Sequence, residues 1–179
     1  MSEEQVGQSV NPGVAKGCKG CAIAIGASLT LILVVGILGR QHPVTSSDEP
    51  KKAIEKLLGK KDNMGGARVR DGETGWSNGW LVVAYNADEN LTPGMTRTGC
   101  LMDIEELIAP LLAAYESANG VQVKAYLALT DPRGHTEHGL VMRADFSRGN
   151  SASINWENVL MDNIPSLAEV YWEHPALSK

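Results

Sequence analysis

One stretch of this chain constrains its fold more than any other, because residues 21–39 read CAIAIGASLTLILVVGILG and contain no charged side chain. As an α-helix this run would be about 28 Å long, close to the roughly 30 Å hydrocarbon core of a bilayer. A helix buried in a soluble domain would normally carry charges on at least one face. We therefore expect a transmembrane helix over residues 21–39, preceded by a short N-terminal tail at residues 1–20.

Retention of the apolar run is favoured over its removal as a signal peptide. The apolar region of a signal peptide usually has about 7–15 residues and follows a short basic stretch. Here the leader is longer and contains Glu3 and Glu4, so cleavage near Ser46 is the alternative. Lys16 and Lys19 directly precede the run, which predicts a cytoplasmic N-terminus and an extracytoplasmic C-terminal domain at the cell membrane. Positive charge on the other flank leaves the reverse orientation open.

The three cysteines exclude a domain stapled by disulfides. Cys18 and Cys21 form a Cys-x-x-Cys pair beside the apolar run, and Cys100 stands alone far along the chain. One such pair supplies two of the four ligands of tetrahedral zinc, so a metal would need a second chain. The pair could also form a redox couple, but thiol acylation next to the bilayer is the best functional interpretation. The structural interpretation is that both are small residues at the entrance of a helix. We predict no metal site and no cofactor.

Residues 40–66 are expected to form a linker with a basic amphipathic helix. The run KKAIEKLLGKKDN places Ile54, Leu57 and Leu58 on one helical face. The lysines around this face are Lys51, Lys52, Lys56, Lys60 and Lys61. Two interpretations are open: the helix rests on anionic lipid headgroups, or it packs its aliphatic side chains onto the following domain.

The globular part is expected over residues 67–179. From Asn63 onward the chain has eight basic and fifteen acidic residues, so nucleic acid is not an expected partner. Residues 79–86 are rich in β-branched and aromatic side chains and predict a strand buried on both faces near its middle. A loop is expected at residues 87–99.

A helix is then predicted from Leu101 to Tyr115, because apolar residues recur there at helical spacing. Pro110 is expected to kink or divide it, and Gly120 is expected to cap its C-terminus. Residues 121–129 alternate as a half-buried strand. Asp131-Pro-Arg-Gly fits a type I turn.

Residues 140–146 form the return strand of this hairpin, with Leu140, Met142, Ala144 and Phe146 on one face. A polar break is expected at residues 150–153, and short helices at 154–160 and 164–171. The order strand, helix, strand, strand, helix predicts an α+β fold in which helices pack on one face of a small antiparallel sheet.

Three segments of the chain have a recognisable pattern: the run INWENVLMDNIPSLAEVYWEHPAL, the preceding hairpin and the strand NGWLVVAYNADENLT. Together they resemble a group of uncharacterised bacterial membrane-anchored or lipoprotein-like extracytoplasmic domains. The family has no assigned activity, so the resemblance implies a surface-exposed bacterial domain and no mechanism. Lipid-anchored members carry a cysteine after the apolar run, and this sequence has none there.

No catalytic motif is evident. His135 and His138 flank Glu137, but residues three apart on a strand point to opposite faces, and the zincin pattern needs histidines four apart on a helix. Cys100 has no histidine partner visible in the sequence. A hydrolytic enzyme would need a pocket that gathers His135, His138 or Cys100, and we predict no catalytic residues.

The aromatic side chains either complete the core or form a recognition surface. They are Trp76, Trp80, Trp156, Tyr171 and Trp172. The sequence thus predicts a single-pass membrane protein whose small, non-catalytic domain binds a protein or an envelope component. One alternative is an accessory subunit of a membrane complex, in which the transmembrane helix packs through Gly26 and Gly36. The other is a hydrolytic enzyme of unknown substrate.

Overall fold

The computed structural model describes residues 43–177. The predicted transmembrane helix and the cysteine pair Cys18 and Cys21 lie outside these residues. Within residues 43–177, no helix combines the length and the hydropathy that crossing a membrane requires.

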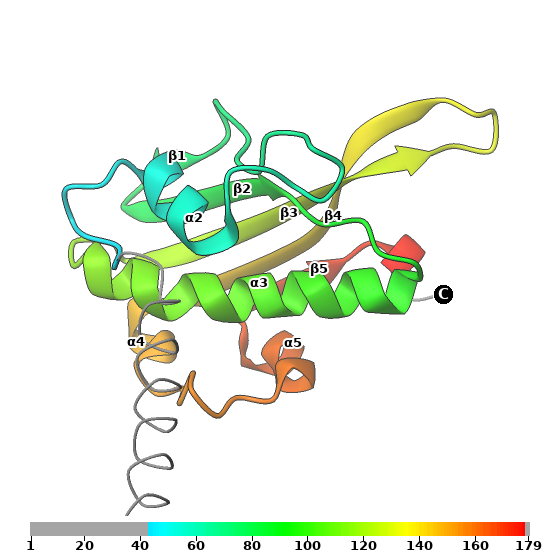
Figure 1. Ribbon diagram of the computed structural model, residues 1–179. Coiled ribbons are helices and arrows are strands. Elements are labelled where there is room, and N and C mark those ends of the chain that lie inside the picture. The colour runs from blue at the N-terminus through cyan, green and yellow to red at the C-terminus, as the bar shows by residue number, and fades with distance from the viewer. Residues whose placement is uncertain (1–42, 178–179) are drawn as a thin grey trace, which may run out of the picture. The chain divides into compact units, whose positions relative to one another are not determined.

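Five strands form one mixed sheet in the order β1-β2-β3-β4-β5 (Figure 1). The strands are β1 (Gly75–Ser77), β2 (Trp80–Asn86), β3 (Gly120–Thr130), β4 (Thr136–Ser147) and β5 (Val170–Glu173). Strands β2 and β3 run parallel, and the other neighbouring pairs are antiparallel. The α+β class is confirmed. The expectation of a purely antiparallel sheet is wrong, because the helix between β2 and β3 returns the chain in the same direction.

Helix α3 (Pro93–Ala114) starts earlier than the sequence predicts. Thr92 caps it, since its side chain accepts a hydrogen bond of 3.2 Å from the Met95 backbone N–H, and Pro93 occupies the first turn. Residues 93–99, expected as loop, are therefore helical. These residues are polar and show no apolar repeat from which a helix could be predicted. Thr96 is nevertheless buried against the domain.

The C-terminal cap of α3 also differs from the prediction, although the end of the helix agrees with it to within one residue. The helix continues through Pro110 and ends at Ala114, where the backbone N–H of the capping residue Tyr115 donates to the Leu111 carbonyl at 2.9 Å. Gly120 is not its cap but the first residue of β3. A side chain at Gly120 would collide with the Trp80 ring and the Phe146 carbonyl, which explains a glycine there.

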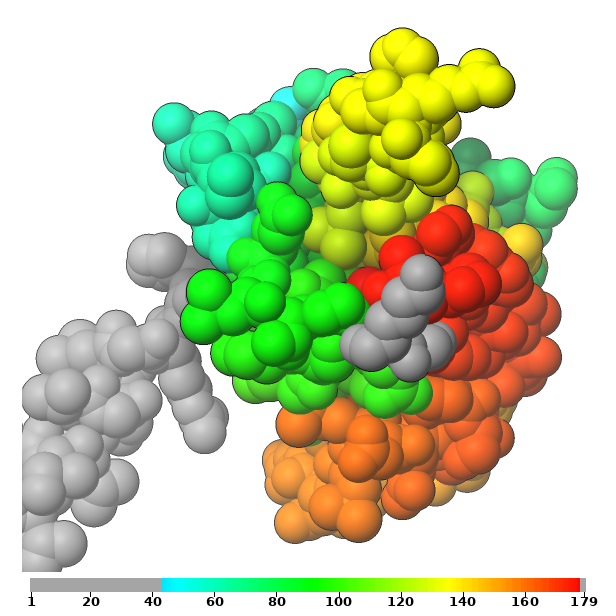
Figure 2. All heavy atoms as spheres, turned by 90° about the vertical axis from the view of Figure 1, so that its right-hand side faces the viewer, coloured from blue at the N-terminus to red at the C-terminus, as the bar shows by residue number. Residues whose placement is uncertain are grey.

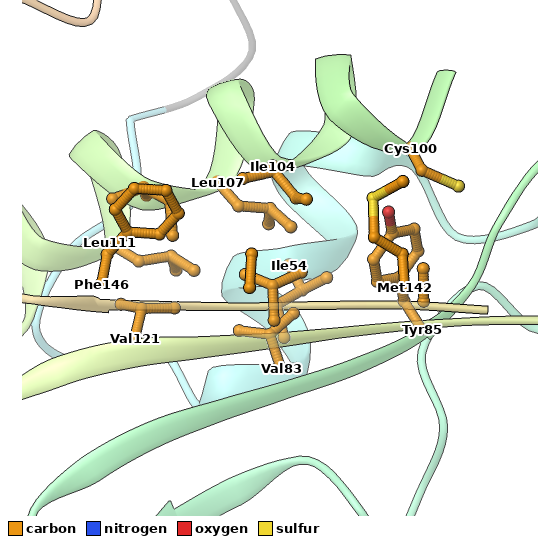
Figure 3. Close-up of a cluster of buried hydrophobic side chains, with 14 of the residues drawn as sticks. Ile54, Val83, Tyr85, Cys100, Ile104, Leu107, Leu111, Val121, Met142 and Phe146 are labelled. Carbon is orange, nitrogen blue, oxygen red and sulfur yellow. The ribbon is translucent and has the colours of Figure 1, made fainter. Parts of the chain in front are cut away.

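The hydrophobic core lies between α3 and one face of the sheet (Figure 3). From the helix come the fully buried side chains of Ile104, Leu107 and Leu111, and the sheet contributes Val83 and Phe146. Full burial of one such side chain stabilises the fold by roughly 1.5–3 kcal/mol. The alternating pattern of the hairpin strands predicted this face.

Helix α2 (Pro50–Leu58) belongs to the same core. Ala53 and Ile54 have no exposed surface, and Leu57 and Leu58 pack against the cluster from its edge. Of the two interpretations of this helix, packing onto the domain is the one observed.

The hairpin of β3 and β4 has the predicted turn. The Gly134 N–H donates to the Asp131 carbonyl at 3.0 Å, and Gly134 has φ +87°, which favours glycine. The register shifts at one point, because Ala125 pairs with Met142 while Tyr126 pairs with Leu140. This bulge turns Leu140 away from the face of Met142, which corrects the predicted alternation.

The C-terminal third differs most from the expectation. Its elements are α4 (Arg148–Ser151), the 3-10 turn η1 (Met161–Asn163), α5 (Ile164–Leu167), β5 and the 3-10 turn η2 (Pro175–Leu177). The expected helix at 154–160 is absent, and the expected helix at 164–171 ends early. Trp156 instead holds its segment in turns by donating to the Ser151 carbonyl and hydroxyl at 3.2 and 3.0 Å. Pairing with β4 makes the aromatic run at Tyr171 a strand.

Candidate interaction surface

The two faces of the sheet have different surroundings. Side chains alternate along β2, so Leu81, Val83 and Tyr85 enter the core that α2 and α3 cover. The intervening side chains belong to the opposite face, which no described helix covers. We call this the open face and define it by Trp80, Gln122, Lys124, Tyr126, Arg143, Asp145, Val170 and Trp172, which the strand register places together.

The loop before β1 covers part of the open face. The Thr74 hydroxyl donates to the Ala84 carbonyl at 3.0 Å and accepts from the Ala84 N–H at 3.1 Å. The Arg70 guanidinium lies 4.1 Å from the centre of the Tyr126 ring, and the Tyr126 hydroxyl donates to Glu73 at 2.5 Å. Burial and this hydrogen bond raise the pKa of Tyr126 to about 12. The predicted burial of the middle of β2 on both faces is thus confirmed.

Two cations lie side by side at the centre of the open face. Lys124 of β3 pairs in register with Arg143 of β4. Arg143 binds Asp145 through Nε and Nη2, at 3.0 and 2.5 Å, and these hydrogen bonds raise the pKa of Arg143. Gln122 donates to the same carboxylate at 3.1 Å.

Lys124 itself has no ion pair or hydrogen bond to another side chain within the described part of the chain. Its charge still acts locally: the pKa of Glu73 is lowered first by the Tyr126 hydrogen bond, then by Arg70 and also by Lys124. In a domain with an excess of acidic residues, this ammonium group is available to an anionic group from outside.

An apolar rim borders these cations. Val170 and Trp172 of the outer strand β5 are 43% and 42% exposed, and Trp172 pairs in register with Arg143. Figure 2 shows the red C-terminal segment at the surface, next to the yellow hairpin of β3 and β4. Aromatic residues and arginine beside exposed apolar surface are typical of protein interfaces.

The five predicted aromatic residues do not form one surface. Trp80 and Trp172 lie on the open face, whereas Trp76 contacts the Tyr115 ring edge-to-face at 5.7 Å. The remaining two serve the interior of the domain. Trp156 packs against the Phe146 ring at 5.2 Å, and the Tyr171 hydroxyl donates to Glu173 at 2.6 Å. Burial and this hydrogen bond raise the pKa of Tyr171.

A shallow hollow of about 310 Å³ lies beside Lys124 on the open face. Thr74 and Gln122 line it, and Trp76 borders it from β1. The hollow offers hydroxyl, amide and ammonium groups to a polar ligand or side chain.

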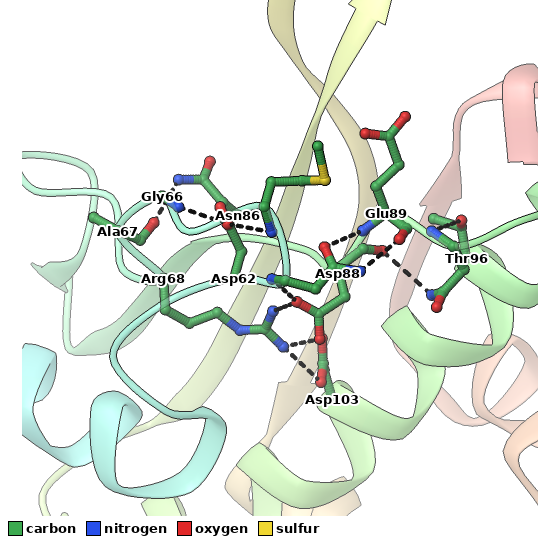
Figure 4. A network of polar contacts seen from close by, with 12 residues as sticks. Asp62, Gly66, Ala67, Arg68, Asn86, Asp88, Glu89, Thr96 and Asp103 are labelled. Carbon is green, nitrogen blue, oxygen red and sulfur yellow. Dashed lines mark hydrogen bonds and ion pairs between the residues drawn. The ribbon is translucent and has the colours of Figure 1, made fainter.

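A buried ionic network, which no sequence pattern predicted, connects the loop before β1 to α3 (Figure 4). Arg68 is 3% exposed and reaches Asp88 at 2.5 Å and Asp103 at 3.1 Å. Burial raises the pKa of Asp103 to about 6, although Arg68 opposes the shift. Arg68 thus joins two carboxylates across the domain, while its Nε and the neighbouring Tyr85 hydroxyl are buried without a hydrogen-bond partner among residues 43–177.

Cys100, His135 and His138, the residues named for the enzyme alternative, do not lie in one pocket. Cys100 is 1% exposed and packs near Tyr85, and burial raises the pKa of its thiol to about 12. His135 and His138 lie on the exposed hairpin, where the ring of His135 contacts the Asp131 carboxylate at 3.2 Å. Among residues 43–177 no group of three potential ligands is placed to hold a metal ion.

Most lysines of the basic helix are already paired. The ion pairs are Lys51 with Asp71 (2.9 Å), Lys52 with Glu49 (3.3 Å) and Lys56 with Asp48 (2.7 Å). The hydrogen bond from Lys56, followed by one from the Thr45 backbone, lowers the pKa of Asp48 to about 2. Lys60 and Lys61 have no ion pair within residues 43–177. The charge that this helix can offer to anionic headgroups is therefore smaller than the sequence suggests.

Comparison with known proteins finds no matching family model, no matching curated protein and no matching solved structure. The resemblance to bacterial membrane-anchored domains stays a prediction. The open face is therefore the feature of the molecule that bears most on its function.

Proposed function

We propose that this chain is a single-pass membrane protein whose extracytoplasmic α+β domain binds a protein or envelope component at the bacterial cell surface, without catalysing a reaction. Residues 21–39 would supply the anchor. The observation that carries the binding role is the register row of Lys124, Arg143 and Trp172 on the open face. It combines a cation without a partner side chain with exposed apolar surface.

The chemistry of this row favours a protein partner with an acidic side chain. Arg143 is committed to Asp145, so Lys124 is the group that can bind a carboxylate from outside. Val170 and Trp172 would lose water on contact, which supplies the apolar part of the binding free energy. The domain's overall negative charge would oppose acidic partners elsewhere on its surface.

Photocrosslinking in intact cells tests the binding face. A benzophenone amino acid would replace Val170 on the open face or, as the control, Met102 on the outer side of α3, which is 53% exposed. We expect one discrete adduct from position 170 and none of the same mass from position 102. The adduct should disappear with Lys124→Glu and persist with Lys61→Glu. Equal adducts from both positions, or an adduct that Lys124→Glu leaves unchanged, would overturn the assignment.

Thiol labelling tests the anchor and its orientation. Arg133→Cys places a thiol in the exposed hairpin turn and avoids Gly134, whose positive φ disfavours a side chain. Cys100 can stay because it is buried, while Cys18 and Cys21 are changed to Ser. Labelling by a membrane-impermeant maleimide before lysis, on full-length protein in the carbonate-washed membrane fraction, is the expected result. Labelling only after lysis would place the domain in the cytoplasm.

A further inference from the structure

A hollow of about 710 Å³ lies where the described chain begins. Its apolar lining consists of Val44, Pro50, Trp76, Ala113, Ala114 and Tyr115. We call this region the Trp76 end. The Trp76 side chain is 49% exposed, and its indole N–H has no hydrogen-bond partner within residues 43–177. The indole lies beside small apolar residues and meets the Tyr115 ring, so its exposed surface is not explained by the open face alone.

The chain leaves this end little freedom to move away from a membrane. Val44 packs against the core, and only residues 40–43 separate it from the predicted transmembrane helix. Five fully extended residue steps span at most about 18 Å. A domain of this size has a radius of gyration of roughly 14 Å. With residues 21–39 as the proposed anchor, the Trp76 end would therefore stay within about one domain radius of the bilayer.

We propose that the Trp76 end rests on the bilayer, with the Trp76 indole in the interfacial region among the lipid headgroups. This inference rests on the proposed anchor at residues 21–39. Indole is favoured at this depth because its ring is apolar while its N–H can donate to lipid phosphate or carbonyl oxygens. The contact fixes which side of the domain faces the membrane and leaves the outer edge of the sheet, with Trp172, free for a partner.

The surrounding charges indicate that this contact does not depend on anionic lipid. Lys51, Lys52 and Lys56 are neutralised by ion pairs, and Glu116 of the lining is exposed. Attraction to a negative surface potential would require unpaired lysines at this end, and Lys60 and Lys61, which have no ion pair among residues 43–177, do not line the hollow. The Trp76 contact should therefore form on zwitterionic bilayers and change little with salt.

Trp172 provides a matched control, because it is 42% exposed but lies on β5, at the opposite edge of the sheet from β1. The full-length protein would be labelled with 5-fluorotryptophan and placed in phosphatidylcholine nanodiscs that contain a gadolinium-chelate lipid. The four ¹⁹F resonances would be assigned with Trp76→Phe and Trp172→Phe. Because the measurement uses the wild-type chain, it does not depend on how well a variant folds.

We expect the Trp76 resonance to broaden at least twofold more than that of Trp172, equally with and without 30% phosphatidylglycerol. Equal broadening, or stronger broadening of Trp172, would overturn the proposed orientation. Broadening that appears only with phosphatidylglycerol would assign the contact to lysines instead. Failure of the anchor has another signature, because the protein would not co-purify with nanodiscs and none of the four resonances would broaden.

Discussion

The core face and the open face of the sheet come from the same strands, yet they are stabilised in different ways. On the core face, Val83, Val121 and Phe146 are fully buried by helices. On the open face, Arg143 and Asp145 hold each other, while Lys124 is held by no side chain of residues 43–177. Residues that pack can be replaced only at a cost in stability, whereas a residue without a partner is free to serve binding. The comparison therefore separates the residues that make the fold from those available for function.

The largest effect on stability is expected for the buried ionic network of Arg68. Arg68→Ala should lower the free energy of unfolding by about 4 kcal/mol at pH 7, because it leaves Asp88 and Asp103 without their shared cation. Urea unfolding of the fragment 41–179, followed by tryptophan fluorescence, measures this. The loss should be smaller at pH 5, where Asp103 is protonated. A loss below 1 kcal/mol would show that the network is not essential to the fold.

The next largest loss of stability is expected from truncation of an apolar side chain in the core. Leu107→Ala removes a fully buried side chain between α3 and the sheet and should cost about 3 kcal/mol through lost burial and a residual cavity. The same urea experiment applies, with Leu91→Ala as the control, since Leu91 is almost fully exposed. Equal effects of the two substitutions would contradict the core as described.

These two residues also illustrate what sequence reasoning can reach. Leu107 lies in a helical repeat of apolar residues, which is a local signal, and the central helix, β2 and the hairpin were predicted from such signals. Arg68 has no local signal, because its partners lie twenty and thirty-five residues away. Its role follows only from the tertiary structure.

The elements that sequence reasoning did not predict have one property in common, which is that no local sequence pattern marks them. β1 and β5 have three and four residues, too few to show a repeat, and each is a strand because a neighbour pairs with it. The early start of α3 depends on a cap at Thr92 and not on periodicity. The candidate site was predicted in part: composition identified Trp80 and Trp172, but only the strand register places Lys124 beside Arg143.

The core side should also determine how stability depends on pH. The folded-state pKa of Asp103 is about 6, above its ordinary value of 3.8, so folding favours its protonated form. This contribution is complete below pH 3.8 and is lost as the pH rises through 6, by on the order of 3 kcal/mol. Asp103→Asn should remove that loss from the difference between unfolding free energies at pH 4 and pH 7. A difference identical to that of the wild type would assign the pH dependence to other groups.

The smallest effect on stability is expected on the open face, where substitution of the two neighbouring cations, Lys124 and Arg143, should have different consequences. Lys124→Gln should change the free energy of unfolding by less than about 0.5 kcal/mol, because it breaks no ion pair and removes a like charge opposite Arg143. Arg143→Gln should cost about 1–3 kcal/mol, because Asp145 is only 6% exposed and would lose two hydrogen bonds.

Urea unfolding of both variants, combined with the crosslinking from position 170, distinguishes structure from function within this row. Lys124→Gln should keep the fold and weaken the adduct, since it removes the ammonium group but adds no repulsive charge. Arg143→Gln should destabilise the fold, and any loss of the adduct should follow from that destabilisation. If Lys124→Gln destabilised the domain as much as Arg143→Gln, Lys124 would be a structural residue, and the open face would lose the group that makes it a binding surface.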